Sequence, residues 1–209
     1  MTDHLRERGE VSALPAFSTI RRARRDDARH LARLVDLAGE GLPRYLWSQM
    51  AQEGEDVWSV GERRAARDEG SFSWRNAWVA EADGQVAGTL IAYDIGPDPQ
   101  PLDNLPEMFR PLQALENRVP LTRYINVLAC FPQFRRRGIG RQLMETQQEF
   151  AGPNGLSIIV ADRNQQAIAL YRSLGFSEAA RLAIVKESWT CESSDWVLLT
   201  RPSTAGVAP

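Results

Sequence analysis

Histidine and cysteine are scarce in this sequence. Its 209 residues include two histidines, His4 and His30, and two cysteines, Cys130 and Cys191. Two cysteines so far apart do not form a disulfide framework in a chain of this size. The sequence has no CxxC pair and no Cys/His cluster, so we expect two buried or half-buried thiols and no metal site.

The sequence also lacks a strong excess of charge and any long apolar run. Its formal net charge is −2, whereas nucleic-acid-binding domains usually carry a basic excess on one face. The first ten residues lack the apolar segment of a signal peptide, and no stretch reaches the length of a membrane span. We therefore expect no nucleic-acid partner, no membrane partner and a cytoplasmic location.

The composition has an ordinary globular balance, with 43% hydrophobic and 25% charged residues. At this length roughly 70% of the surface of the unfolded chain can be buried, which predicts one domain with a core of its own. We expect this domain to span residues 17–202, between mobile tails at 1–16 and 203–209. The proline-rich segment 95–121 is predicted to be an insertion, either a lid or specificity loop or inert surface.

The N-terminal half predicts both strands and helices. A short strand is expected at 18–23, followed by a helix that begins after Asp26 and Asp27 and ends at Gly39. Asp83-Gly84 between two β-rich runs is typical of a hairpin turn. The other elements expected here are helices within 42–75, hairpin strands at 76–82 and 86–94, and a short helix over 106–116.

The predicted helical region 42–75 is rich in aromatic residues for a connecting segment. One interpretation is a helical cover that packs these rings on a sheet. The other is that some of the rings form the wall of an acceptor pocket. The residues concerned are Trp47, Trp58, Phe72 and Trp74.

From residue 124 onward the pattern becomes regular. Two apolar runs of strand length, 124–130 and 156–161, are each followed by a helical segment, at 138–150 and 164–174. This alternation predicts a parallel β-α-β unit with a right-handed crossover. Two further strands are expected at 176–186 and 196–200.

The loop after the first of these strands contains the run Arg135-Arg136-Arg137-Gly138-Ile139-Gly140. Helix N-termini carry free N–H groups and partial positive charge, glycine lets the backbone approach an anion, and arginine adds cations. The loop therefore predicts a pyrophosphate or polyphosphate ligand. It is not a dinucleotide fingerprint, because Leu143 occupies the third glycine position, and it lacks the Gly-Lys-Ser/Thr of a Walker loop.

This loop resembles the acyl-CoA-binding motif of the GNAT superfamily of N-acetyltransferases. The motif reads Arg/Gln-x-x-Gly-x-Gly/Ala, and Arg135, Gly138 and Gly140 hold its fixed positions. Residues 164–176 are similar to the family's second motif, Asn-x-x-Ala-x-x-Leu-Tyr-x-x-x-Gly-Phe. Its fixed positions are held by Asn164, Ala167, Leu170, Tyr171, Gly175 and Phe176. Two ordered motifs are more specific than either one alone.

The resemblance implies a single mixed, mostly antiparallel sheet with helices on both faces. Its central parallel pair, 124–130 and 156–161, would splay apart to hold the pantetheine arm of acetyl-CoA, the implied cosubstrate. The backbone of the first strand would contact pantetheine or the thioester carbonyl, where an N–H can stabilise an oxyanion. The implied cofactor-binding residues are Leu128, Ala129, Cys130, Arg135, Arg136, Arg137, Gly138, Ile139, Gly140, Asn164 and Tyr171.

Tyr171 is the predicted catalytic side chain. An amine that attacks a thioester expels a thiolate, and the reference pKa of a thiol is about 8.5. A tyrosine hydroxyl, with a pKa near 10, is protonated at neutral pH and can donate a proton to that thiolate. Its position within the second motif favours this role over that of a core aromatic.

The sequence does not identify the general base that takes the amine proton. Family members place a glutamate either at the start of the cofactor-side strand or on the next parallel strand, and Tyr124 and Ile159 occupy these positions here. A water relay that touches Tyr124 or Asn126 is one alternative. The carboxylates near strand ends or in the insertion are Glu81, Asp94 and Glu116.

The expected function is therefore an acyl-CoA-dependent N-acyltransferase. In its simplest form it moves an acetyl group from acetyl-CoA to a primary amine by direct attack in a ternary complex. The aromatic region and the insertion favour a small amine or amino-acid-like acceptor. A protein or peptide acceptor, a non-catalytic acyl-CoA-binding module and a different phosphate ligand remain open, and a homodimer is compatible with the resemblance.

Overall fold

The computed structural model describes residues 18–203. The tails predicted at 1–16 and 203–209 therefore lie outside the described residues, apart from Ser203. Among the described residues, no helix is both long and apolar enough to cross a membrane.

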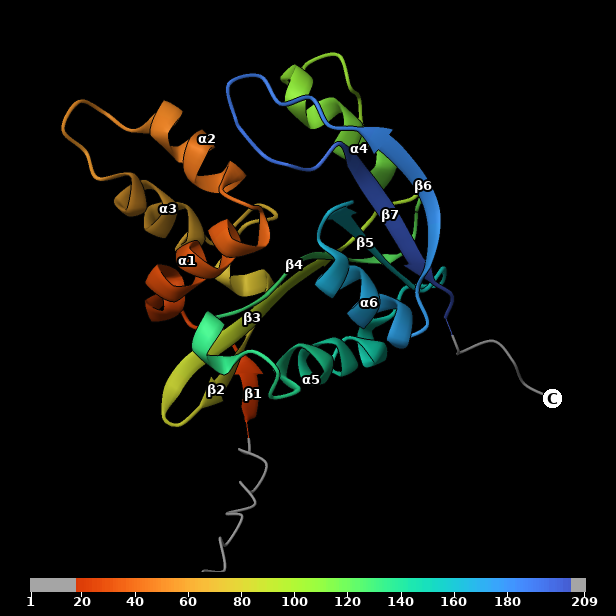
Figure 1. The fold of residues 1–209 in the computed structure, drawn as a ribbon, viewed down its shortest axis with the longest axis horizontal. Helices are drawn as coiled ribbons and strands as arrows, with labels where there is room; N and C mark the ends of the chain where they lie inside the picture. Colours follow the sequence, from red (N-terminus) through yellow and green to blue (C-terminus); the bar gives the residue numbers. More distant parts are fainter. Residues whose placement is uncertain (1–17, 204–209) are drawn as a thin grey trace, which may run out of the picture.

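The centre of the fold is a seven-stranded sheet with the strand order β1-β2-β3-β4-β5-β7-β6 (Figure 1). Every neighbouring pair is antiparallel except β4 and β5, which run parallel in the middle of the sheet. The prediction of a mixed, mostly antiparallel sheet with one central parallel pair is confirmed. The strands are β1 (Thr19–Arg22), β2 (Ala77–Ala82), β3 (Gln85–Asp94), β4 (Arg123–Cys130), β5 (Leu156–Ala161), β6 (Ser177–Ala183) and β7 (Asp195–Arg201).

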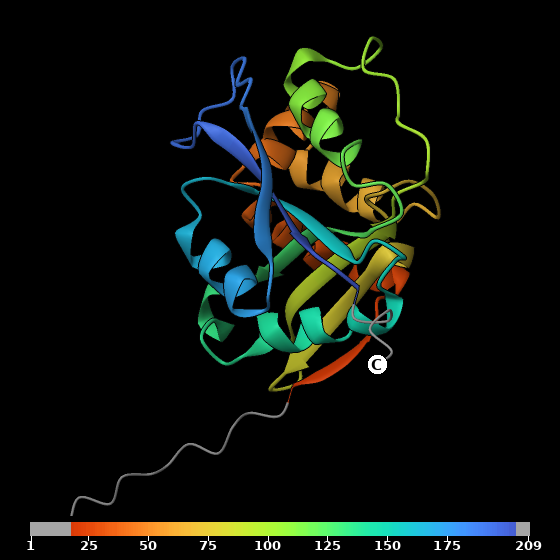
Figure 2. The same ribbon diagram turned by 90° about the vertical axis from the view of Figure 1, so that its right-hand side faces the viewer.

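Helices cover both faces of this sheet. Figure 2 shows α4 beside α2 and α3 on one face, with α5 and α6 on the other. The core is divided in the same way: Ile91 and Val127 pack toward α1 and α3, whereas Leu90 and Ile125 pack toward α5 and α6. The helices are α1 (Ala28–Ala38), α2 (Leu42–Met50), α3 (Val57–Ala65), α4 (Arg110–Glu116), α5 (Ile139–Glu145) and α6 (Gln165–Ser173).

The aromatic residues of the region 42–75 belong to the core between helices and sheet. Trp47 is 2% exposed and stacks on Phe72 with ring centroids 6.0 Å apart, while Trp58 meets Trp47 edge to face. Trp74 packs against the same cluster. The structure thus agrees with the helical-cover interpretation of these rings.

The predicted insertion contains α4, preceded by the 3-10 turn η3 (Glu107–Phe109). Leu115 of α4 is fully buried, in a cluster that contains Leu198 of β7 and Trp196. Asn117 then holds the long loop, because its side chain accepts from Gln100 N at 2.9 Å and donates to Gln100 O at 2.8 Å. The insertion is therefore fixed against the β5–β7–β6 half of the sheet.

The helix predicted over 138–150 is shorter than expected, and this part of the prediction was wrong. α5 ends at Glu145, and a separate 3-10 turn, η5 (Gln148–Phe150), follows. Thr146 Oγ1 donates back to Leu143 O at 2.7 Å, and Gln147 is fully buried at the break. Phe150 is thereby placed on the ring of Trp78, with centroids 5.5 Å apart. Tertiary packing has overridden the local helical pattern here.

Candidate active site

The two parallel strands separate after a short paired segment. β4 and β5 are in register only from Arg123 with Leu156 to Ile125 with Ile158. Beyond that point β4 continues alongside β3, and β5 continues alongside β7. Within residues 18–203, the second half of β4 therefore has no strand partner on its β5 side. A pocket of about 840 Å³ lies at this divergence.

A β-bulge marks the point of separation. Ile91 of β3 is opposite Val127, but the next residue, Ala92, is opposite Ile125, so Asn126 is an extra residue in β4. A bulge bends the strand that carries it and increases its twist. Because the parallel pairing ends at Ile125, the bulge directs the rest of β4 away from β5 and helps to open the pocket.

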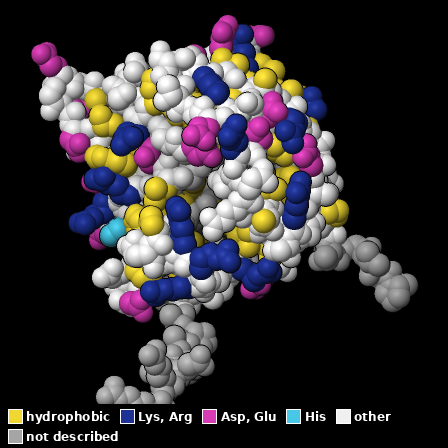
Figure 3. Space-filling model, viewed as in Figure 1, with side chains coloured by type: hydrophobic (Ala, Val, Ile, Leu, Met, Phe, Trp, Pro, Cys, Tyr) yellow, Lys and Arg dark blue, Asp and Glu magenta, His cyan; other side chains and the backbone are white. Residues whose placement is uncertain are grey.

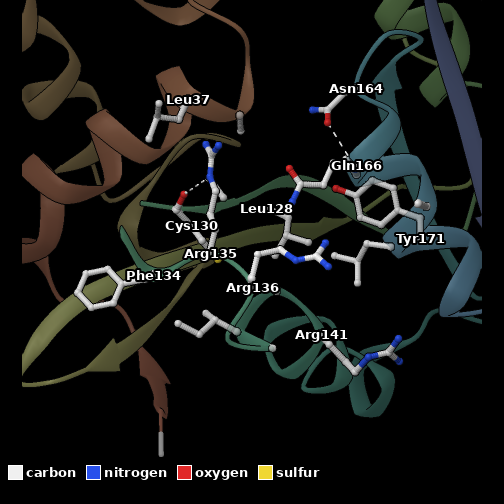
Figure 4. Close-up of a pocket in the computed structure, with 18 of the residues that line it drawn as sticks. Leu37, Leu128, Cys130, Phe134, Arg135, Arg136, Arg141, Asn164, Gln166 and Tyr171 are labelled. Carbon is white, nitrogen blue, oxygen red and sulfur yellow. Dashed lines mark hydrogen bonds between the residues drawn. The ribbon is translucent and has the colours of Figure 1, made fainter. Parts of the chain in front are cut away.

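The pocket brings together the predicted site residues (Figure 4). It is lined by β4, by the loop after β4, by α5 and by α6, and every predicted cofactor-binding residue except Arg137 belongs to its lining. The predicted residues in the lining are Leu128, Ala129, Cys130, Arg135, Arg136, Gly138, Ile139, Gly140, Asn164 and Tyr171.

The loop between β4 and α5 has the conformation expected of a tight anion cradle. Arg136 and Gly138 both have left-handed backbone, with φ of 64° and 80°. Arg135 Nε donates to Cys130 O at 3.3 Å, while Arg136 and Arg141 also line the pocket. Figure 3 shows Lys and Arg side chains gathered across the lower part of this face. α5 has only seven residues, and Arg135, Arg136 and Arg141 supply the cationic side chains of this part of the pocket.

Arg137 is arranged differently from its two neighbours. Its guanidinium forms an ion pair with Asp83 in the β2–β3 turn, at 2.7 Å, and lies over the ring of Phe134. It is absent from the pocket lining. The sequence presents three equivalent arginines, but only two of them face the pocket.

Asn164 and Tyr171 enter the pocket from the two ends of α6. Asn164 caps the helix, because its Oδ1 accepts from Ala167 N at 3.2 Å. Tyr171 is 4% exposed. Burial, with a smaller contribution from Cys130, raises its pKa above the ordinary value, so the phenol is protonated throughout the neutral range. It can therefore donate a proton but does not act as a base.

Cys130 is a free, half-buried thiol at the end of β4. Burial raises its pKa to about 11. Only a small fraction is thiolate at neutral pH, and the thiolate is the nucleophilic form of cysteine. Cys130 is therefore a weak nucleophile at neutral pH.

The remaining wall of the pocket comes from the junction between α1 and α2, which the sequence did not point to. Leu37, Ala38 and Glu40 line it. Burial raises the pKa of Glu40, and the nearby carboxylates of Asp162 and Glu192 raise it further. Glu40 is the one carboxylate among the described residues that line this pocket.

Of the three carboxylates considered as a base, Glu116 alone is both half-buried and free of an ion pair within residues 18–203. Glu81 is bound to Arg21 at 2.6 Å, and Asp94 is bound to Arg123 at 3.1 Å with most of its side chain exposed. Glu116 instead accepts from Tyr93 Oη, which is 3.4 Å from both carboxylate oxygens. Tyr93 was not singled out from the sequence, since it had no motif to mark it.

The chain is similar in sequence to several proteins, including a named acetyltransferase. It is 29% identical over 141 residues to an uncharacterized protein from Mycobacterium leprae, a match that covers 67% of this chain and 37% of that protein. It is 47% identical over 55 residues to the ribosomal protein bS18-alanine N-acetyltransferase of Salmonella typhimurium, covering 25% of this chain and 37% of that enzyme. The matched region thus spans well under half the length of these relatives.

The fold is also shared with solved structures. An N-acetyltransferase from Staphylococcus aureus superposes with a TM-score of 0.60 at 20% identity, over 88% of this chain and 100% of that one. The profile of the Acetyltransferase (GNAT) family matches residues 44–176, which contain β4, the arginine loop and α6. The chain therefore belongs to the GNAT family of acetyltransferases.

Proposed function

We propose that this protein is an acyl-CoA-dependent N-acetyltransferase that transfers an acetyl group from acetyl-CoA to a primary amine by direct attack in a ternary complex. The observation that carries the proposal is the convergence of both sequence motifs on one pocket at the divergence of β4 and β5. In this proposal, residues 17–202 work as one acetyltransferase domain with 95–121 as its insertion.

The residues around the pocket fit a ligand of the CoA type. The loop of Arg135, Arg136 and Gly138 would hold the pyrophosphate. A Cβ added at Gly140 would lie 3.3 Å from Leu170 Cδ2, so glycine keeps the first turn of α5 close to α6. The free edge of β4 at Leu128–Cys130 would pair with pantetheine, as an added strand does.

The chemistry supplied by the cosubstrate is an activated acetyl thioester. Backbone N–H groups on the free edge of β4 would polarise the thioester carbonyl. Tyr171 would donate its phenolic proton to the departing sulfur. The protonated state of the Cys130 thiol supports direct transfer to the amine over a two-step route through cysteine.

A small cationic amine or amino-acid-like molecule is the acceptor that we favour. Glu40 lines the pocket with Asp162 and Glu192 close enough to raise its pKa. This end is bounded by α1–α2, and Trp189 Nε1 donates to Glu40 O at 3.4 Å, tying the β6–β7 loop to that junction. The Glu40 carboxylate would pair with a compact ammonium.

A protein acceptor is the second candidate. It is supported by the Salmonella typhimurium relative, whose name gives a ribosomal protein alanine as its acceptor. A panel of free amino acids, linear diamines and a peptide with N-terminal alanine separates the two. Turnover of the peptide alone would select the protein acceptor. Acetyl-CoA binding without turnover of any amine would select a non-catalytic module.

Acetyl-CoA should bind and stabilise the protein, whereas ATP and NADH should not. At a ligand concentration of a hundred times Kd, the free energy of unfolding should rise by roughly 2.7 kcal/mol. Calorimetric titration and thermal shift measure both effects on the same sample. A folded sample that binds either nucleotide in preference to acetyl-CoA would contradict the proposal.

Arg136→Ala should weaken acetyl-CoA binding about 10-fold to 100-fold, because charge-assisted contacts to phosphate contribute about 1.5–3 kcal/mol each. Arg137→Ala is the matched control, since Arg137 is paired with Asp83 and lies outside the pocket lining. It should change the Kd less than about 2-fold, because exposed ion pairs contribute little. Equal effects of both substitutions would argue against this division of roles.

A further inference from the structure

We propose that Glu116, the last residue of α4 in the 95–121 insertion, is the general base that takes the proton from the acceptor amine. This inference rests on the proposed function. It supplies the general base that this chain lacks at the two usual glutamate positions, which Tyr124 and Ile159 occupy. The observations that carry it are the position of the Glu116 carboxylate beside the tyrosines of β3 and β4, and the absence of a cation paired with it among residues 18–203.

The carboxylate lies at the base of the divergence between β4 and β5. Tyr93 Oη is 3.4 Å from each Glu116 oxygen, and the ring of Tyr93 meets the ring of Tyr124 edge to face at 5.3 Å. Tyr124 is paired with Ser157 in the last stretch of parallel strand, two residues before the bulged Asn126. The Glu116–Tyr93–Tyr124 cluster therefore sits where the strands part.

The cluster is also near Tyr171, the proposed general acid. Tyr124 is close enough to both Glu116 and Tyr171 for each of them to raise its pKa, with burial as the main cause. Tyr124 is thus near both the proposed base and the proposed acid. In this inference an acceptor nitrogen bound near Tyr124 passes its proton to Glu116, directly or through one water.

The surroundings of Glu116 favour proton uptake near neutral pH. Burial raises the pKa of Glu116 to about 7, and the hydrogen bond from Tyr93 opposes that rise. Several charged groups on the elements around α4 pair with one another and not with Glu116. These pairs are Arg123 with Asp94, Arg181 with Glu178 and Asp195, and Arg110 with Glu107.

The reaction balances with these two groups. The neutral amine nitrogen forms a bond to the carbonyl carbon, and the bond from that carbon to sulfur breaks. The proton lost by nitrogen goes to the Glu116 carboxylate, and the sulfur takes a proton from the Tyr171 hydroxyl. The Glu116 carboxylic acid and the Tyr171 phenolate then regain their starting states by proton transfer through water, without any oxidant or reductant.

The experiment compares the full-length wild type with Glu116→Gln on the best amine of the panel. Gln keeps the size of Glu116 and can still accept from Tyr93, but it cannot take up a proton. We expect kcat to fall about 100-fold at pH 7.5 with the Kd for acetyl-CoA unchanged. Glu107→Gln is the matched control, because Glu107 is an exposed carboxylate of the same insertion, and it should keep wild-type kcat.

The pH profile distinguishes a base from a structural residue. Wild-type kcat/KM should rise through an apparent pKa near 7, separate from the limb of an alkyl amine near pH 10, and Glu116→Gln should lose the limb near 7. Glu116→Gln should also melt several degrees above wild type at pH 8. The Tm difference should vanish below pH 4.5, because a raised pKa lowers stability as pH rises toward that pKa.

The outcomes separate this inference from the function on which it rests. If wild type acetylates an amine and Glu116→Gln keeps its kcat and the limb near pH 7, the base assignment is overturned and the acetyltransferase stands. If wild type binds acetyl-CoA but acetylates none of the amines, the catalytic function fails and the base assignment fails with it. Loss of kcat together with the limb, in a variant that melts no lower than wild type, supports the inference.

Discussion

Replacing Tyr171 by Phe should lower kcat about 1,000-fold, within the range that a positioned general acid contributes. The substitution removes one oxygen and keeps the ring, which packs in the main core cluster and meets Phe176 with centroids 6.0 Å apart. Burial holds the pKa of the phenol above its ordinary value, so the hydroxyl carries its proton at every pH at which the enzyme would be assayed. The loss should therefore appear in the chemical step.

Single-turnover kinetics with saturating acetyl-CoA measure that step directly. The Kd for acetyl-CoA and the midpoint of urea unfolding should stay close to those of wild type, because the packing of the ring is retained. Tyr45→Phe is the control for loss of a tyrosine hydroxyl away from the pocket, since Tyr45 packs in the cluster around α4 and β7. A Tyr171→Phe enzyme with full kcat on a good acceptor would exclude the acid role.

The part of the site that could be predicted from sequence is the part that is local in the chain. A strand, a loop that ends at Gly138 and a helix with Gly140 in its first turn follow one another within residues 123–145, so their spacing fixes how the loop meets the strand end. The second motif is one helix with its cap, and Asn164 performs that cap role in the structure. Local geometry of this kind needs no knowledge of distant contacts.

The parts that were missed depend on contacts between distant segments. Tyr93 and Glu116 are 23 residues apart in sequence, and their pairing depends on how α4 docks. Glu40 meets Trp189 across 149 residues. Arg137 could not be distinguished from Arg136 in a run of three arginines, because its partner Asp83 comes from a hairpin turn 54 residues away. Pairings of this length leave no periodic pattern in the sequence.

The bulge at Asn126 could not be predicted either, because it depends on the pairing of β4 with β3 and not on local sequence. The apolar run of β4 predicts a strand but not its register against β3, and the register decides where the extra residue lies. The divergence of β4 from β5 was implied by family resemblance and not by the residues of the strand. The pocket therefore depends on a feature of strand pairing that sequence pattern alone does not encode.

Gly155 directly precedes β5 at the start of the parallel pair. Among the backbone positions near the site, it should be the one at which a side chain lowers stability most. Gly155 has a φ of +91°, and a Cβ at this position would lie 2.1 Å from Arg201 O and 2.6 Å from the carbonyl carbon of Pro202. These are backbone atoms at the end of the neighbouring strand β7 and just after it, and Arg201 of β7 is paired with Leu156 of β5. Gly155→Ala should therefore lower the free energy of unfolding by about 4 kcal/mol, at the severe end for a single substitution.

The expected loss at Gly155 has two causes, the left-handed backbone and the overlap of a Cβ with neighbouring backbone atoms. Gly54→Ala separates them. Gly54 also has a left-handed φ, of +74°, but a Cβ there would meet nothing within 4 Å. It should lose only the 1–2 kcal/mol, roughly, that a side chain costs in this conformation. Urea unfolding at constant m gives both values. Equal losses at Gly155 and Gly54 would show that β7 moves aside freely. A much larger loss at Gly155 would show that β5 is held rigidly where Gly155 O accepts from Arg123 N at 2.9 Å, and so that the divergence above it starts from a fixed base.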